Sequence, residues 1–161
     1  MTVPMSDDFD RAKDCAFWYL NRKRYTKKEI IEKLVSRDYS REVAERVADH
    51  LEEREYIDDR DYARRYILDA VKLKKHGIRR IKTDLSFKGI TADIVDETVE
   101  KTGIDCNAFL PQLLESKAAG ADITDEKQKS RVVSFLVRRG FSYRDINDAI
   151  CEYVIKRENT D

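Results

Sequence analysis

Apolar positions recur along the chain at the three- and four-residue spacing of an amphipathic helix. The clearest stripe consists of Val43, Ala44, Val47, Ala48 and Leu51. A constant offset of 51 residues, the difference between positions 30 and 81, carries this pattern along the chain. The matching positions are Ile30, Ile81 and Val132; Leu34, Leu85 and Leu136; Ala44, Val95 and Ile146; and Ala48, Val99 and Ile150. The pattern therefore predicts a repeated helical unit.

Each unit contains a turn of shared chemistry, with a basic residue, a turn residue, a large apolar residue and a hydroxyl. The turns lie at residues 37–40, 88–91 and 139–142. Gly89 and Gly140 can adopt the left-handed conformation that ends a helix, and Asp38 tolerates it. We expect the hydroxyl residues to cap the next helix, as Ser40, Thr91 and Ser142. Thr26 with Glu29, and Ser142 with Asp145, approach a capping box.

A further helix precedes each pair, at about residues 7–22, 58–75 and 107–119. Because proline fits only the first turn of a helix, Pro111 indicates a start near Leu110 or a kink. The sequence thus predicts an all-α fold of nine helices in three tandem three-helix repeats, at residues 1–55, 56–103 and 104–161. Units of this size bury little core alone, so we expect them to stack into an elongated, curved array.

The composition agrees with helices that expose much surface, because 40% of the residues are charged while Gly (5) and Pro (2) are scarce. The longest uncharged apolar stretch, 16–20, is too short to cross a bilayer. Acidic residues also occupy the start of the chain, where a secretory signal would be basic and then apolar. We expect a cytoplasmic protein. Its cysteines, Cys15, Cys106 and Cys151, are predicted to be reduced and to lie in the core.

The 32 basic and 32 acidic residues balance, so only the distribution of charge can indicate a partner. Residues 60–90 hold ten Lys or Arg, with His76 beside them, against only Asp61, Asp69 and Asp84. A charge run is often a solvated helix face, but a local excess of seven favours binding. The partner could offer phosphates or an acidic protein surface.

The sequence offers no constellation for catalysis, so we expect a protein that is not an enzyme and needs no cofactor, metal or small-molecule substrate. The acids at 58–61 suit a helix start better than a metal site. The histidines, His50 and His76, lack ligands or a nucleophile at a recognised spacing. A helix-turn-helix DNA reader is disfavoured because the helix after the first turn, residues 41–53, carries five acids against two arginines.

Four ordered segments make the chain resemble the RecX family of regulatory proteins: RYTKKEI (24–30), YIDDRDYAR (56–64), GIRRI (77–81) through to KGI (88–90), and FLVRRGFS (135–142). The middle two are the specific ones, with an acidic pair opening an aromatic-rich helix about twenty residues before the Gly-x-Arg-Arg-Ile segment. The resemblance spans residues 15–152. The chain departs from the family at Ile78, where many members have proline, and at Pro111.

The resemblance implies a regulator that binds the RecA recombinase and its filament on single-stranded DNA, inhibits RecA ATPase and strand exchange, and so modulates recombination, DNA repair and the SOS response. The alternative is a nucleic-acid-binding protein that acts alone through phosphate contacts, and weak direct DNA binding is compatible with both. The matched segments and their neighbours supply the candidate contact residues: Arg64, Arg79, Arg80, Lys82, Lys88, Arg138 and Arg139. Tyr62 and Tyr66 are expected to pack between units.

Overall fold

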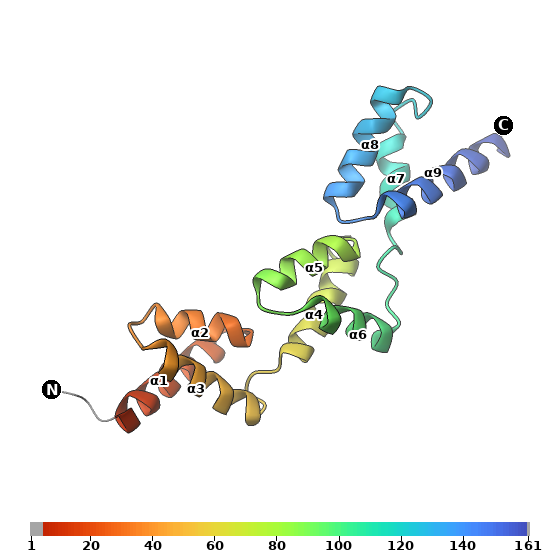
Figure 1. Ribbon diagram of the computed structural model, residues 1–161. Coiled ribbons are helices and arrows are strands. Elements are labelled where there is room, and N and C mark those ends of the chain that lie inside the picture. The colour runs from red at the N-terminus through yellow and green to blue at the C-terminus, as the bar shows by residue number, and fades with distance from the viewer. Residues whose placement is uncertain (1–4, 161) are drawn as a thin grey trace.

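The computed structural model describes residues 5–160, and all the regular structure in that range is helical. The nine helices are α1 (Met5–Leu20), α2 (Lys27–Val35), α3 (Arg41–Glu53), α4 (Asp59–Lys72), α5 (Ile78–Phe87), α6 (Ala92–Thr102), α7 (Leu110–Ala118), α8 (Glu126–Arg138) and α9 (Tyr143–Glu158). They form three successive three-helix units in an elongated, curved array (Figure 1). The predicted fold class is confirmed. No described helix is both long and apolar enough to cross a membrane.

The helix starts follow the predicted cap chemistry. Thr26 and Glu29 form a capping box, in which the Thr26 side chain accepts from the Glu29 N–H at 3.2 Å and the Glu29 carboxylate accepts from the Thr26 N–H at 2.9 Å. Ser40, Thr91 and Ser142 cap α3, α6 and α9. The acid at Asp145 instead accepts from the Ser142 hydroxyl at 2.8 Å. Aspartate is one methylene shorter than glutamate, which explains why this second capping box is incomplete.

The helix ends follow the turn chemistry. Asp38, Gly89 and Gly140 have φ angles of 67°, 81° and 101°, so all three adopt the predicted left-handed conformation. α7 begins at Leu110 with Pro111 in its first turn, as one of the two alternatives expected. α4 ends at Lys72, earlier than predicted, because the chain turns before Lys75, which has a φ of 55°.

Each unit buries its own apolar core, in the 51-residue register. Ile30, Ile81 and Val132 are buried at matching positions of the three cores. The register extends to the first helix of each unit, where Ala12, Ala63 and Leu114 are buried. The described part of the chain thus contains three small cores rather than one large core.

The cysteine prediction is wrong for Cys151. Cys15 and Cys106 are partly buried beside their unit cores, but Cys151 is exposed on α9. α9 buries Ile146 and Ile150, which are four residues apart on one face. Cys151 follows Ile150 by one residue, about 100° further around the helix, and therefore points away from the core.

A hydrogen bond between equivalent positions of the repeat joins each unit to the next. At the joint between units 1 and 2, the Thr26 hydroxyl donates to the Lys88 carbonyl at 2.6 Å. At the joint between units 2 and 3, the Gly77 N–H donates to the Arg139 carbonyl at 2.9 Å. Positions 26 and 77, and likewise 88 and 139, are related by the 51-residue offset. In both joints, the start of one unit's second helix lies against the turn of the next unit.

The second joint brings two backbone segments very close. A Cβ atom on Gly140 would lie 2.5 Å from the Cβ of Arg80 and 2.6 Å from its backbone nitrogen. A Cβ atom on Gly77 would lie 2.5 Å from the carbonyl carbon of Gly140. Glycine at these two positions is therefore required by the packing of unit 2 on unit 3.

We expect Gly140→Ala to lower the free energy of unfolding by more than about 2 kcal/mol, because it combines left-handed strain with a clash. Gly103 also has a positive φ but has nothing within 4 Å of an added Cβ, so Gly103→Ala should cost only about 1 kcal/mol. Gly120→Ala, with neither strain nor clash, is the neutral control. Urea denaturation followed by circular dichroism measures all three, and equal losses at positions 140 and 103 would contradict the clash.

Candidate partner-binding surface

A hollow of about 460 Å³ opens at the joint between units 2 and 3. It is lined by Arg79, Arg80, Thr83 and Asp84 of α5, by Val137 and Arg138 of α8, and by Gly140 and Tyr143. We call it the joint 2–3 hollow. The backbone contact of Gly77 with Arg139 explains its position, because it holds the first turn of α5 against the end of α8. Three of the predicted contact residues, Arg79, Arg80 and Arg138, therefore meet in one place.

The joint 2–3 hollow carries excess positive charge. Arg80 has its Nε 3.8 Å from the Asp84 carboxylate and donates from Nη1 to the Arg138 carbonyl at 3.5 Å. Arg79 and Arg138 are exposed and have no ion-pair partner among the described residues. Three guanidinium groups around one carboxylate leave two positive charges unbalanced. Tyr143, which is 60% exposed, adds an aromatic ring to the rim.

The other four predicted contact residues lie elsewhere and are engaged within the protein. The Lys82 ammonium lies 2.7 Å from the Asp96 carboxylate of α6, and the Lys88 ammonium donates to Glu29 of unit 1 at 2.7 Å. Arg139 donates to the Lys74 carbonyl at 2.8 Å, and Arg64 donates to Asp61 at 2.8 Å. Lys88 and Arg139 thus hold the two joints together.

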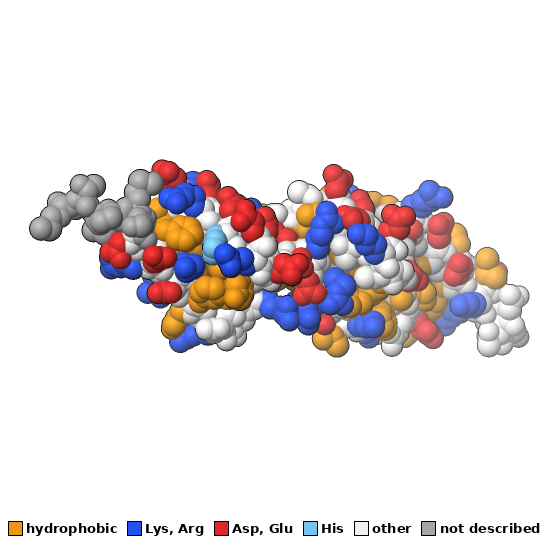
Figure 2. Space-filling model, turned by 90° about the horizontal axis from the view of Figure 1, so that it is seen from below, with side chains coloured by type: hydrophobic (Ala, Val, Ile, Leu, Met, Phe, Trp, Pro, Cys, Tyr) orange, Lys and Arg blue, Asp and Glu red, His pale blue; other side chains and the backbone are white. Residues whose placement is uncertain are grey.

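Besides Gly140, which the sequence identified as a turn residue, four residues of the hollow were not predicted as contacts: Thr83, Asp84, Val137 and Tyr143. The position of Tyr143 directly after the helix cap Ser142, outside the apolar stripe of α9, was an available signal. The other three carry no signal in the sequence. Across the face shown in Figure 2, basic and acidic side chains are interspersed.

The acidic residues at the start of α4 act in capping and in the first joint. The Asp58 side chain accepts from the N–H groups of Arg60 and Asp61, so its predicted capping role is confirmed. The Asp59 carboxylate accepts from the Lys27 N–H of unit 1 at 2.9 Å. Burial raises the pKa of Asp59. The described residues contain no group of three potential ligands that could hold a metal ion.

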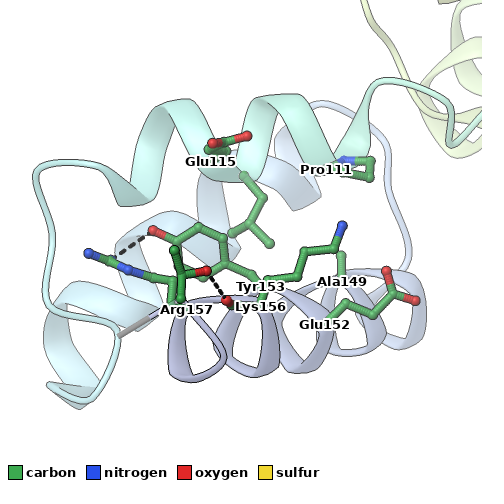
Figure 3. Close-up of a pocket in the computed structure, with 9 residues that line it drawn as sticks. Pro111, Glu115, Ala149, Glu152, Tyr153, Lys156 and Arg157 are labelled. Carbon is green, nitrogen blue, oxygen red and sulfur yellow. Dashed lines mark hydrogen bonds between the residues drawn. The ribbon is translucent and has the colours of Figure 1, made fainter.

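A second hollow, of about 340 Å³, lies between α7 and α9 (Figure 3). Pro111 lines it at the position that Phe9 occupies in unit 1 and Arg60 in unit 2. Phe9 packs on His50 with ring centroids 5.6 Å apart, and Arg60 pairs with Glu97, so both side chains span from the first helix to the third. The short proline ring cannot span this gap. Pro111 thus leaves space at its end of the hollow, and none of the predicted contact residues lines the hollow.

His76 lies beside the joint between units 2 and 3, with only 7% of its surface exposed. Its Nδ1 atom is buried without a hydrogen-bond partner in the described part of the chain. Burial lowers the pKa of His76, and the positive charges of Arg80, Arg139 and Lys74 lower it further, against an opposing effect of Asp84. The neutral imidazole is therefore the form that fits the folded protein.

Comparison with known proteins identifies relatives that share this three-unit architecture. Family models described as the first, second and third three-helix domains of RecX match residues 12–51, 58–99 and 112–150. The regulatory protein RecX of Finegoldia magna is 33% identical over 140 residues, which cover 84% of this chain and 68% of that protein. The regulatory protein RecX of Vibrio vulnificus is 29% identical, over 87% of this chain and 91% of its own. The crystal structure of RecX from Lactobacillus salivarius superimposes with a TM-score of 0.76 at 25% identity, over 93% of this chain and 99% of that chain.

We expect the adjacent arginines at the end of α8 to differ in their effect on stability. Arg139→Ala removes the hydrogen bond to the Lys74 carbonyl and should lower the free energy of unfolding by about 1 kcal/mol. Arg138→Ala is the matched control and should leave it within about 0.5 kcal/mol, because this exposed side chain makes no comparable contact. Thermal melts of both variants test the difference, and a larger loss at position 138 would contradict it.

His76 should make the protein less stable in mild acid. Its folded-state pKa lies below the value of about 6.5 in an unfolded chain, so the unfolded state binds more protons as the pH falls below 6.5. Stability should therefore be retained above pH 6.5 and lost below it. His76→Asn, which does not titrate, should reduce this part of the pH dependence when urea unfolding is measured between pH 5 and 8. An identical pH dependence in both proteins would contradict the prediction.

Proposed function

Because the chain belongs to the RecX family of regulatory proteins, we propose that it binds the RecA recombinase and the filament that RecA forms on single-stranded DNA. In this proposal it inhibits RecA ATPase and strand exchange, and so modulates recombination, DNA repair and the SOS response. It acts in the cytoplasm, as a binding protein rather than an enzyme.

The observation that carries the proposal is the meeting of Arg79, Arg80 and Arg138 in the joint 2–3 hollow. Arginine and tyrosine are the side chains that most often dominate the binding energy of protein interfaces. We therefore assign the direct contacts to these three arginines with Tyr143. Lys82, Lys88 and Arg139 would support that surface by holding the helices and the joints in place.

Inhibition of this kind needs no chemistry from the bound protein. The hydrogen-bonded joints hold the contact surfaces of the three units at fixed separations. A rigid array binds best to the partner geometry that matches those separations, and so shifts the partner toward that geometry. If the geometry differs from the one that hydrolyses ATP, binding alone lowers the ATPase rate.

A nucleic-acid-binding protein acting alone remains the second candidate, because the same arginines could contact phosphates. Asp84 in the hollow and the acids interspersed on the surface in Figure 2 weaken that reading, since they would repel a phosphate backbone. The two candidates differ in their response to naked DNA and to RecA.

The decisive experiment titrates the protein into a RecA ATPase assay with single-stranded DNA. The wild-type chain should suppress ATP hydrolysis. The double variant Arg79→Glu with Arg138→Glu should need at least about tenfold more protein for the same effect, equivalent to about 1.4 kcal/mol of binding energy. Arg131→Glu, an exposed arginine of α8 outside the hollow, serves as the control.

Three results would argue against parts of the proposal. An unchanged ATPase rate at saturating wild-type protein would refute the RecA-regulating function. Full inhibition by the double variant would refute the assignment of the contacts to the joint 2–3 hollow. Strongly salt-dependent binding to naked single-stranded DNA, lost in the double variant while RecA ATPase is unaffected by the wild type, would favour the second candidate.

A further inference from the structure

A second arginine-lined hollow, of about 560 Å³, lies at the joint between units 1 and 2. It is lined by Arg24, from the segment between α1 and α2, and by Tyr62, Arg64, Arg65, Tyr66, Leu68 and Asp69 of α4. We call it the joint 1–2 hollow. Only Arg64 of this set was a predicted contact residue, and it lies here apart from the others.

The three arginines of this hollow converge on a single carboxylate. Asp61 accepts from Arg24 at 2.9 Å, from Arg64 at 2.8 Å and from Arg65 at 2.9 Å. The hydrogen bonds from Arg64 and Arg65 lower the pKa of Asp61, which stays ionised. Asp69 also lines the hollow, so three positive charges against two negative charges leave an excess of one. Each guanidinium has five N–H donors, so most donors remain available to a ligand.

The arginines are also held in place before any partner arrives. Their shared carboxylate fixes three long side chains that would otherwise lose rotamer freedom on binding. Tyr62 and Tyr66 stack with ring centroids 6.4 Å apart, and the Tyr66 hydroxyl donates to Asp84 at 3.0 Å. Burial and this hydrogen bond raise the pKa of Tyr66 to about 12. The hollow thus has a fixed aromatic wall and a fixed basic rim.

The repeat does not require these arginines. At the positions 51 residues further on, Arg64 and Arg65 correspond to Glu115 and Ser116. At the positions 51 residues earlier they correspond to Lys13 and Asp14. The three-helix unit therefore folds with very different side chains at both positions. The two arginines of unit 2 are not explained by the fold, and a binding role accounts for them.

We propose that the joint 1–2 hollow is a second contact site for the protein partner and that it takes an acidic segment of that partner. The inference rests on the proposed function. Carboxylate side chains of such a segment would match the arginine donors in bidentate pairs. Tyr62, Tyr66 and Leu68 offer apolar surface to the residues that flank those carboxylates in the segment.

A single-stranded nucleic acid fits the joint 1–2 hollow less well. Asp61 and Asp69 lie at the hollow, and the three arginines exceed these two acids by only one charge, so a continuous run of phosphates would be repelled along part of its path. An isolated carboxylate between apolar residues brings only one negative charge to the arginines, whereas a run of phosphates brings several close to Asp61 and Asp69. Arginine and tyrosine, which make up five of the seven residues that line the hollow, are enriched at protein interfaces.

The test compares Arg65→Glu with Lys72→Glu. Both substitutions change the charge of α4 by the same amount, but Lys72 is exposed and lies outside the hollow. The labelled variants are titrated with RecA assembled on single-stranded DNA, and separately with the naked strand, by fluorescence anisotropy. We expect Arg65→Glu to weaken filament binding at least about tenfold relative to Lys72→Glu, with equal affinity of the two variants for the naked strand.

The outcomes separate this inference from the proposed function. If the wild type binds the filament and both variants bind it equally, the second site is refuted and the proposed function stands. If Arg65→Glu loses affinity for the naked strand in parallel with the filament, the occupant is nucleic acid and the inference is wrong. If the wild type does not bind the filament at all, both fail. Should circular dichroism show that Arg65→Glu is unfolded, Arg65→Gln replaces it, with an expected loss of several-fold.

Discussion

The carbonyl groups of Lys88 and Arg139 receive hydrogen bonds from the start of the preceding unit's second helix, and the placement of the three units depends on these contacts. Each unit has its own small core, so the cores alone would leave three bodies connected by short segments of chain. The joints add backbone and side-chain contacts that are directional and short. They turn the repeat into an array with defined spacing.

The same joint is built in two ways. Between units 1 and 2 it relies on side chains, with the Thr26 hydroxyl, the Asp59 carboxylate and the Lys88 ammonium as partners. Between units 2 and 3 it relies on backbone N–H groups, because Gly77 stands in place of Thr26 and allows the chains to approach closely. The basic residues of the second and third turns, Lys88 and Arg139, therefore have a structural task as well as a charge.

The joints also determine where positive charge gathers on a chain whose net charge is zero. Each joint brings side chains from two units to one hollow, with three guanidinium groups, at least one carboxylate and at least one tyrosine. The excess of positive charge in each hollow arises from this local convergence, while the face shown in Figure 2 mixes both signs. A partner that recognises both hollows is selected by their separation as well as by their chemistry.

The sequence by itself determined the helices, the caps at Thr26 and Ser142, the left-handed turns and the core positions, because these depend on residues close together in the chain. The resemblance to the RecX family, which the sequence carries, also identified Arg79, Arg80 and Arg138 as candidates. Only the tertiary structure showed that Lys88 and Arg139 bind neighbouring units, that Tyr143 lines the hollow and that Cys151 is exposed. Hydrophobic periodicity reports which face of a helix is buried, whereas the partner of a charged side chain depends on groups that are distant in the sequence and meet only when the units dock.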